Sequence, residues 1–530
     1  MRRIAYRFLA ATSLASGGTG ALARPSRAKL GRSLRSRQCW VCHSLPGAVL
    51  IMLMIGSTAA AATRPHYGGT LRIMLQSAPN VLDLPANITS SEYWDAVRTL
   101  SLIGDTLVKL DAQDRPQPAL AVAWQSDPGT RHWQFTLRHG VKFHDGSAAS
   151  PAAIAQILGA LHSDWNVRAS ADSLSIEGET AMPALLAELA LPRNLLFKRN
   201  GNGVPIGTGP FLVAQWQPGK LLKLAANEES WAGRPFVDAV EIEFGKSLRD
   251  QAIALELDKA DIIETPSQAA NAPERHNPSS SLLLSMPVEL LALVFPANSK
   301  AQDPRLREAL SLAIERKPIQ SVLLKGAGEA AASILPNWMT GYSAVFSTQA
   351  NLQRARTLLA DSRQPALNLS YDPRDLQAQL IAERIALNAR EVGITLQVSL
   401  SGAEDIRLMR VVLPSPDPAT SLAEATRQLG LPQAAFPATP RGDSLDDLYQ
   451  AERSSLEGYS VIPLFHLPVA SAASARVHGW GPDRLGDWSS AGFSLASLWL
   501  ADQRLAEQGL TDQRPADSRS YGPHPQVGSQ

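Results

Sequence analysis

One short motif in this sequence has the residue types and spacing for covalent cofactor attachment. Cys39-Trp40-Val41-Cys42-His43 matches the C-x-x-C-H pattern in which two thiols and an imidazole hold a c-type haem. Haem attachment needs the motif on the exported side of a membrane. Here the motif precedes an apolar stretch that is typical of export, so it would be left behind or removed. We therefore predict no haem.

Two glycine-containing segments are weaker candidates for chemistry. Gly201–Gly209 contains four glycines, as phosphate-binding loops do, but Pro205 and Pro210 remove backbone donors and no helix pattern follows. We interpret this segment as a loop that leads into a strand. Gly492–Ala496 resembles a nucleophile elbow, yet His524 is the only histidine after its serine, so we expect no Ser-His-Asp triad.

His466 is the histidine whose position best suits contact with a solute, because it ends the apolar run Val461–Phe465. A structural histidine that satisfies a backbone carbonyl is the alternative. The sequence contains no H-E-x-x-H motif, no closely spaced pair of histidine ligands and no Walker loop. It therefore predicts no catalytic residue, no metal site and no cofactor.

Composition and charge limit the class of protein. The chain has 530 residues, 45% of them apolar and 19% charged, which is enough for two or three domains. Residues 1–62 hold nine Lys or Arg and no Asp or Glu, which leaves 41 basic and 49 acidic residues in the remainder. An acidic body lacks the basic face that nucleic-acid binding requires, so we expect no nucleic-acid partner. Both cysteines lie in residues 1–62, so the body has no disulfide and no thiolate site.

Residues 1–62 have the order of a secretory signal. Basic residues precede the apolar stretch Ala48–Ile55, and small residues ending in Ala60–Ala62 follow it. We predict cleavage directly after these alanines and a periplasmic mature chain that begins near Thr63. An uncleaved membrane anchor is the alternative, but this stretch is shorter than the roughly 20 apolar residues that a span requires.

The rest of the chain alternates between strand and helix patterns, which predicts an α/β protein. Helix starts are indicated where a capping residue precedes proline, and strands where apolar and polar residues alternate. The expected elements are a strand over 70–75, a β-hairpin over 133–146, helices from Ser150-Pro151, from Asp303-Pro304 and over 372–392, a strand over 394–400, and a disordered tail over 506–530.

Several stretches, in this order along the chain, carry a family resemblance. The most specific is Gly140–Gly146, which reads Gly-Val-Lys-Phe-His-Asp-Gly. The others are Gly68–Arg72, Val81–Asp83, Asp105–Val108, Pro116–Ala121 with Trp124, Gly207–Phe211 with Trp216, Asn227 and Trp231 with Gly233–Phe236, Val294–Ile314 and Ile462–His466. Together they resemble family 5 of the bacterial extracytoplasmic solute-binding proteins, the dipeptide, oligopeptide and nickel binders of ABC importers.

The resemblance implies a periplasmic binding protein-like fold of type II, with two lobes joined by crossing strands and a cleft between them. Lobe I would comprise residues 63–290 and 468–505, and lobe II residues 291–467. The resemblance further implies a monomeric, non-enzymatic receptor. Its partners would be a small-molecule solute and an ABC permease in the membrane.

Alignment to the family also proposes residues for the cleft. Asn80 and Val81 follow the first strand, and Trp338, Ser401 and His466 come from later segments. We expect these five residues to bind the solute. For Trp338, a place in the core is the alternative.

One departure from the family bears on the ligand. Peptide binders of the family carry a tryptophan and an aspartate ahead of a Pro-Asp-Pro segment, and that aspartate pairs with the α-ammonium of the peptide. Here Val411 and Pro414 stand at those positions, and the chain is shortened elsewhere. An unpaired buried ammonium would cost several kcal/mol, so we expect no ordinary free-peptide binding. A divergent member that acts as a sensor or protein-interaction module is the alternative function.

Overall fold

The computed structural model describes most of the chain. The described residues are 65–84, 90–111, 115–267, 280–342, 345–360, 365–400, 404–431, 445–480 and 495–501, and all of them belong to one compact unit, Thr63–Gln530. The predicted signal over 1–62 with its C-x-x-C-H motif, the candidate residue Ser401 and the predicted tail over 506–530 lie outside them. Within these ranges, no helix has the length and apolar character needed to cross a membrane.

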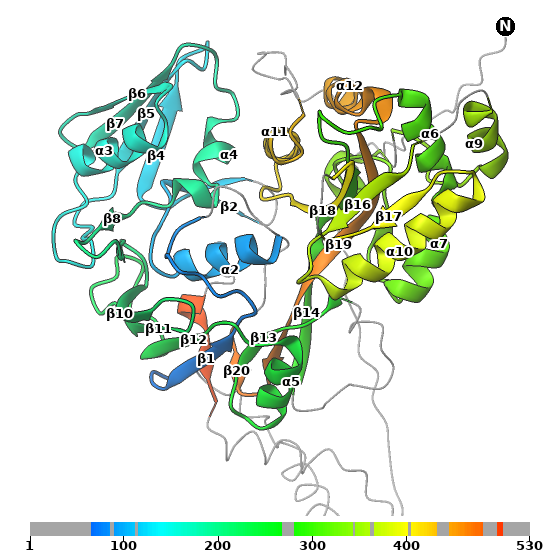
Figure 1. Cartoon of the computed structure of the whole chain (residues 1–530). Helices are drawn as coiled ribbons and strands as arrows, with labels where there is room; N and C mark the ends of the chain where they lie inside the picture. The colour runs from blue at the N-terminus through cyan, green and yellow to red at the C-terminus, as the bar shows by residue number, and fades with distance from the viewer. Residues whose placement is uncertain are drawn as a thin grey trace, which may run out of the picture. The chain divides into compact units, whose positions relative to one another are not determined.

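A large mixed sheet runs through the unit (Figure 1). It combines parallel pairs, such as β1 with β12 and β16 with β18, with antiparallel pairs around β14 and β19. Its strands in spatial order are β10 (Phe211–Gln217), β11 (Leu221–Ala226), β12 (Ala239–Glu243), β1 (Thr70–Met74), β13 (Ile262–Glu264), β19 (Val461–Ser474), β14 (Ser280–Val294), β18 (Ile406–Val412), β16 (Leu367–Tyr371) and β17 (Leu396–Val398), and β15 (Glu329–Ala330) pairs with β19.

Two long antiparallel strands connect the two halves of this sheet. β14 and β19 have 15 and 14 residues, and their pairing runs from Ser280 opposite Ser474 to Val294 opposite Val461. At one end β19 pairs with β13, beside the apolar core around β1 and β12. At the other end β14 pairs with β18, beside a second core around β16. These strands therefore contribute side chains to both cores, as crossing strands do.

Helices cover the second core, and their starts follow the capping pattern expected from the sequence. Asp303 and Asp375 accept backbone N–H groups at the first turns of two of them. The second of these helices begins at Leu376 and not at residue 372 because Asp375 caps it, and Gly393, with a φ of +89°, follows its end. The elements are α6 (Pro304–Ala313), α7 (Arg316–Pro318), η3 (Ile319–Leu323), α9 (Leu352–Leu359), α10 (Leu376–Glu391) and η4 (Glu457–Tyr459).

A further cluster lies on the β14–β18 side of the sheet and joins α8 (Asn337–Thr340), α11 (Pro418–Gln428) and α12 (Leu445–Ser455). Beside the first core lie α2 (Ser90–Leu100), α5 (Leu248–Glu256) and η5 (Leu495–Ser497), and β20 (Val477–His478) pairs with β21 (Trp499–Leu500). α2 packs against the crossing strands through Tyr93, Trp94 and Val97.

A smaller antiparallel sheet has its own apolar core. The strands in order are β4 (Ala121–Ser126), β5 (His132–Leu137), β7 (Ser173–Gly178) and β6 (Trp165–Ala169), and the nearby elements are α3 (Pro151–Leu161), α4 (Leu185–Leu189), η1 (Pro192–Asn194) and the pairs β2 (Val108–Leu110) with β3 (Pro116–Pro118) and β8 (Lys198–Arg199) with β9 (Pro205–Ile206). The helix expected after Ser150 is confirmed, since the Ser150 side chain accepts the N–H of Ala153.

The hairpin expected over 133–146 is wrong. β5 pairs with β4 on one edge and β7 on the other, so no edge is left for the following segment. Val141 and Phe143 are nevertheless buried, because they pack into the core of the small sheet from a loop closed by the Lys142–Ala148 bridge. Their alternation therefore marks a buried loop and not a strand.

The glycine-rich segment leads into β10, as expected. Gly207 and Gly209 lie against the backbone of Ile103 and Gly104, and a Cβ on Gly207 would lie 2.0 Å from the carbonyl oxygen of Ile103. No side chain fits there. These two glycines therefore allow two backbone segments to pack closely.

Candidate functional site

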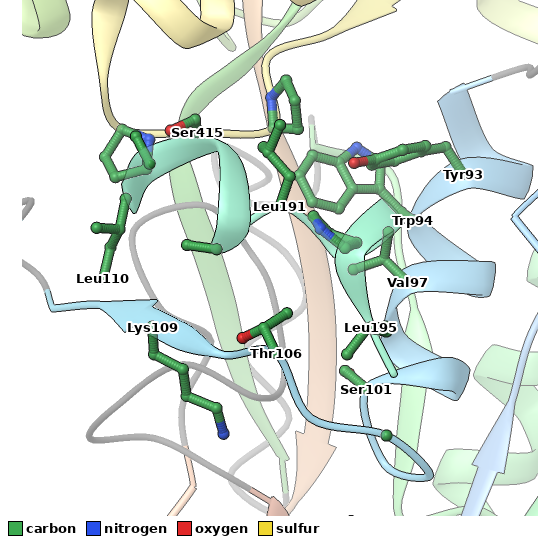
Figure 2. Close-up of a pocket in the computed structure, with 16 residues that line it drawn as sticks. Tyr93, Trp94, Val97, Ser101, Thr106, Lys109, Leu110, Leu191, Leu195 and Ser415 are labelled. Carbon is green, nitrogen blue, oxygen red and sulfur yellow. The ribbon is translucent and has the colours of Figure 1, made fainter. Parts of the chain in front are cut away.

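A pocket that is open to solvent lies where three parts of the chain converge (Figure 2). One wall is α2 and the turn after it, the second is β2 with α4 and η1, and the third is the segment between β18 and α11. The lining residues are Tyr93, Trp94, Val97, Ser101, Gly104, Thr106, Lys109, Leu110, Ala187, Ala190, Leu191, Pro192, Leu195, Pro414, Ser415 and Pro416. A mostly apolar lining with a few polar groups is typical of a small-molecule site.

The α2 wall supplies two aromatic rings and an aliphatic side chain. Tyr93 and Trp94 meet edge to face, with ring centroids 5.5 Å apart. Tyr93, Trp94 and Val97 are nearly inaccessible to solvent and pack on Val288 and Val412 of the crossing sheet. Figure 2 shows the three side chains projecting from α2 into the pocket, with Leu110 on the opposite side. The rings therefore form a fixed apolar surface.

A buried polar network holds the indole of Trp94. Its Nε1 donates to Oε1 of Glu289 on β14 at 3.0 Å, and Arg410 on β18 donates to Oε2 of the same carboxylate at 3.2 Å. Arg410 also donates from Nε to Asp375 at 2.7 Å. Burial would raise the pKa of Asp375, but Arg410 outweighs burial and holds that pKa below its usual range. The network thus links a pocket ring to the N-terminus of α10.

Among the described lining residues, Lys109 is the one that carries a charge, and it already has an ionic partner. Its Nζ lies 3.4 Å from Oδ1 of Asp105, a buried carboxylate behind the wall. Oδ2 of Asp105 accepts the hydroxyl of Thr208 at 3.0 Å and the indole N–H of Trp231 at 2.9 Å. The pair compensates its own charge, so this wall offers the pocket little net charge.

The serine and threonine hydroxyl groups of the lining also have backbone partners. Ser101 donates to the carbonyl of Arg98, and Thr106 donates to that of Val108. The hydroxyl of Ser415 accepts the N–H of Asp417. These groups are therefore held in fixed positions around the apolar surface.

The third wall contains the segment in which the sequence departs from the peptide binders. Pro414 lines the pocket, whereas Val411 is fully buried in the core beneath α11. Asp417 caps α11, with its side chain accepting the N–H of Thr420 at 2.8 Å. No carboxylate from this segment is among the described residues that line the pocket.

None of the four described candidate residues is among the pocket-lining residues. Asn80 and Val81 lie in the exposed segment after β1, and Val81 is 68% exposed. Asn80 lies near Gly219, in the turn that joins β10 and β11. These two residues are therefore at the surface, and their part in binding stays a prediction.

Trp338 and His466 pack in the interior and do not line the pocket. Trp338 packs on the cluster that contains Tyr93 and Trp94, and its Nε1 donates to the carbonyl of Pro287 at 2.8 Å. His466 is fully buried, with Nε2 3.0 Å from the carbonyl oxygen of Ile334. Because a carbonyl accepts, Nε2 carries the proton. Burial lowers the pKa of His466 to about 4, so the imidazole is neutral at neutral pH.

Sequence reasoning missed the aromatic wall, because α2 was not among the expected elements. A usable signal existed. Tyr93, Val97 and Ser101 recur every four residues, which places them on one face of a helix, and an acidic residue, Glu92, stands in its first turn. The packing of that helix on the crossing strands depends on tertiary contacts that the sequence pattern does not contain.

Comparison with known proteins supports the resemblance. A family model described as bacterial extracellular solute-binding proteins, family 5 Middle, matches residues 177–407. Over this segment the chain is similar to family 5 of the bacterial extracellular solute-binding proteins. The chain is also 27% identical over 350 residues to the nickel-binding periplasmic protein of Escherichia coli K12, an alignment that covers 58% of this chain and 66% of that one. The chain thus spans about two thirds of that relative's length.

Solved structures support the same fold. The oligopeptide-binding protein AppA of Bacillus subtilis, solved with a nonapeptide, superposes with a TM-score of 0.70 at 16% identity, over 83% of this chain and 100% of that one. AgaA of A. tumefaciens R10, solved with agropinic acid, has a TM-score of 0.70 at 20% identity, over 82% and 99%. The type II periplasmic binding protein fold that the resemblance predicted is confirmed.

The described residues offer no group of three or more His, Cys, Asp or Glu side chains placed to hold a metal ion.

Proposed function

We propose that this protein is the extracytoplasmic receptor of an ABC importer and that its solute carries no free α-ammonium group. The observation that carries the proposal is the pocket wall at Pro414. A proline lines the pocket at the position where peptide binders of the family have their ammonium-pairing aspartate. The surrounding wall is apolar and aromatic, and its one charge is compensated. A neutral, N-blocked or non-peptide solute fits this chemistry.

The relatives indicate that the side chains lining the site, and not the fold, determine which ligand binds. By their names, one binds nickel, one was solved with a nonapeptide and one with agropinic acid. The two solved backbones superpose equally well on this chain, yet a nonapeptide and agropinic acid are chemically different ligands. The ligand of this chain follows from its own lining residues.

Nearby carboxylates that might replace the missing aspartate are already engaged. Asp417 caps α11, and Glu289 accepts from Trp94 and Arg410. A buried ammonium would have to compete with these partners. This supports the exclusion of free peptides.

The proposal includes the arrangement expected from the sequence. The mature chain begins near Thr63, is exported to the periplasm, acts as a monomer and presents its solute to a membrane permease. Lobe I comprises residues 63–290 and 468–505, and lobe II residues 291–467. The crossing strands β14 and β19, which serve both cores, support this division.

Native mass spectrometry of the protein purified from its own periplasm tests the receptor function. We expect a retained small molecule whose mass is released on denaturation. Addition of that molecule to the emptied protein should raise its melting temperature by mass action. A protein that carries no solute, and that no member of a broad solute library stabilises, would instead favour the sensor or interaction module.

A further inference from the structure

Two acidic side chains share one guanidinium beside the pocket, and they come from opposite walls. Arg193, in η1, donates from Nη1 to Oε2 of Glu424 on α11 at 2.6 Å, across 231 residues of sequence. It also donates from Nε to Oε1 of Glu188 on α4 at 2.7 Å. Pro192, the neighbour of Arg193, lines the pocket, as does Pro416 just before α11. Figure 1 shows α4 and α11 on the two sides of this contact.

From this geometry we infer that the Arg193–Glu424 ion pair is a reversible latch that holds the two walls of the pocket together. The inference rests on the proposed function, since it concerns how the solute site closes. The Arg193–Glu424 pair would regulate the closure of that site.

Both partners of the latch keep an ion pair on their own wall when the walls separate. Arg193 retains Glu188 within its own wall, and Glu424 retains Arg427 one turn away on α11 together with the side-chain amide of Gln428. A buried carboxylate left unpaired would make opening very costly. Glu424 is 6% exposed, yet opening leaves it paired, so the latch can release.

The burial of Glu424 distinguishes this pair from another ion pair between residues far apart in the sequence. Arg374, before α10, pairs with Glu92 at the start of α2, but these side chains are 55% and 34% exposed. Exposed pairs of this kind contribute little because water and salt screen them. Arg193 is 41% exposed, but its partner is buried, so the Arg193–Glu424 pair is the stronger of the two.

The test measures the distance between the walls in the absence of any solute. Spin labels are placed at Ala184→Cys, before α4, and Ser454→Cys, on α12, both of which are exposed positions. The background is the full chain with Cys39→Ser and Cys42→Ser. We expect the labelled protein with Arg193 and Glu424 intact to show one predominant, short distance between the two spin labels. Arg193→Gln should reduce the population at that distance at least threefold, and 0.5 M NaCl should act in the same direction on the wild type.

The matched control removes the other partner of the same guanidinium. Glu188→Gln breaks an ion pair of Arg193 within one wall, so it should leave the short distance predominant. Glu424→Gln should reproduce the effect of Arg193→Gln, and the double variant should add nothing to it. Because Arg193 is partly exposed, its variant tests the inference even where Glu424→Gln fails to fold.

An unchanged distance distribution in Arg193→Gln, or an equal change in Glu188→Gln, would overturn the latch. These measurements need no solute, so their failure leaves the proposed receptor function standing. Conversely, a protein that binds no solute could still show the latch.

Discussion

At the scale of single residues, the neutral imidazole of His466 links stability to pH. Burial lowers the pKa of His466 from 6.5 to about 4, against smaller opposing effects of the Ile334 and Ser333 carbonyls. Between these values the unfolded chain binds a proton that the folded chain does not. The free energy of unfolding therefore falls as the pH decreases from about 6.5 towards 4, by on the order of 3 kcal/mol in total.

We predict that His466→Gln removes this part of the pH dependence. Glu452 opposes it, because burial raises the pKa of Glu452 from 4.5 to about 6, so its contribution falls as the pH rises through that range. The informative quantity is thus the difference between wild type and variant, measured by urea unfolding from pH 4 to pH 7. Two parallel curves would show that the imidazole is not neutral in the fold.

A second residue prediction concerns the indole of Trp94. Trp94→Phe keeps an aromatic ring but removes the N–H that Glu289 accepts. We expect a loss of about 1–3 kcal/mol in the free energy of unfolding, because the acceptor is a buried carboxylate.

The matched control is Trp338→Phe, which removes an indole bond to the neutral carbonyl of Pro287 within the same cluster. Its cost should be about 0.5–1.5 kcal/mol. Equal losses in the two variants would indicate that the carboxylate network does not hold Trp94.

The predicted cleft residues can be tested at the same scale. The prediction that Trp338 and His466 bind the solute requires that Trp338→Phe or His466→Gln weaken binding of the recovered solute by more than about threefold. Calorimetry with folded variants decides this. Smaller changes in both variants would indicate that Trp338 and His466 are core residues that do not contact the solute.

At the scale of elements, we propose that the segment between β18 and α11 determines the ligand class. Pro414 lines the pocket, but Val411 is buried in the core under α11, where no indole could reach the solute. We therefore predict that Pro414→Asp alone does not create binding of free di- or tripeptides. Calorimetry against a free-peptide panel checks this. Micromolar binding by the variant, with none by the wild type, would show that a single carboxylate is sufficient.

The elements also show how far the sequence could lead. Capped helices such as α3, α6 and α10 were predictable, because a serine or aspartate stands at each start. The hairpin at 133–146 was not, since alternation alone does not reveal that β5 is already paired on both edges.

Most of the pocket-lining residues could not be predicted from the sequence, because tertiary packing brings them together. The importance of Pro414 followed from the family resemblance. Tyr93 and Trp94 became pocket residues only through the packing of α2 on strands almost 200 residues later, at Val288 and Glu289.

At the scale of the whole molecule, the predicted export signal defines the expected mature chain. We predict that the mature protein begins near Thr63 and lacks Cys39 and Cys42, because an apolar stretch and three alanines precede that point. N-terminal sequencing of the periplasmic protein checks this. Recovery of an exported chain that still contains both cysteines would contradict it and would restore the haem motif as a candidate.

We propose that the molecule as a whole is a receptor for a solute without a free α-ammonium group. The most direct measurement is native mass spectrometry of the protein from its own periplasm, followed by calorimetry of the emptied protein with the released molecule and with free di- and tripeptides. We predict a retained neutral, N-blocked or non-peptide solute that binds again, and no tight binding of unmodified peptides. A retained peptide whose affinity requires its free α-amino group would contradict the account.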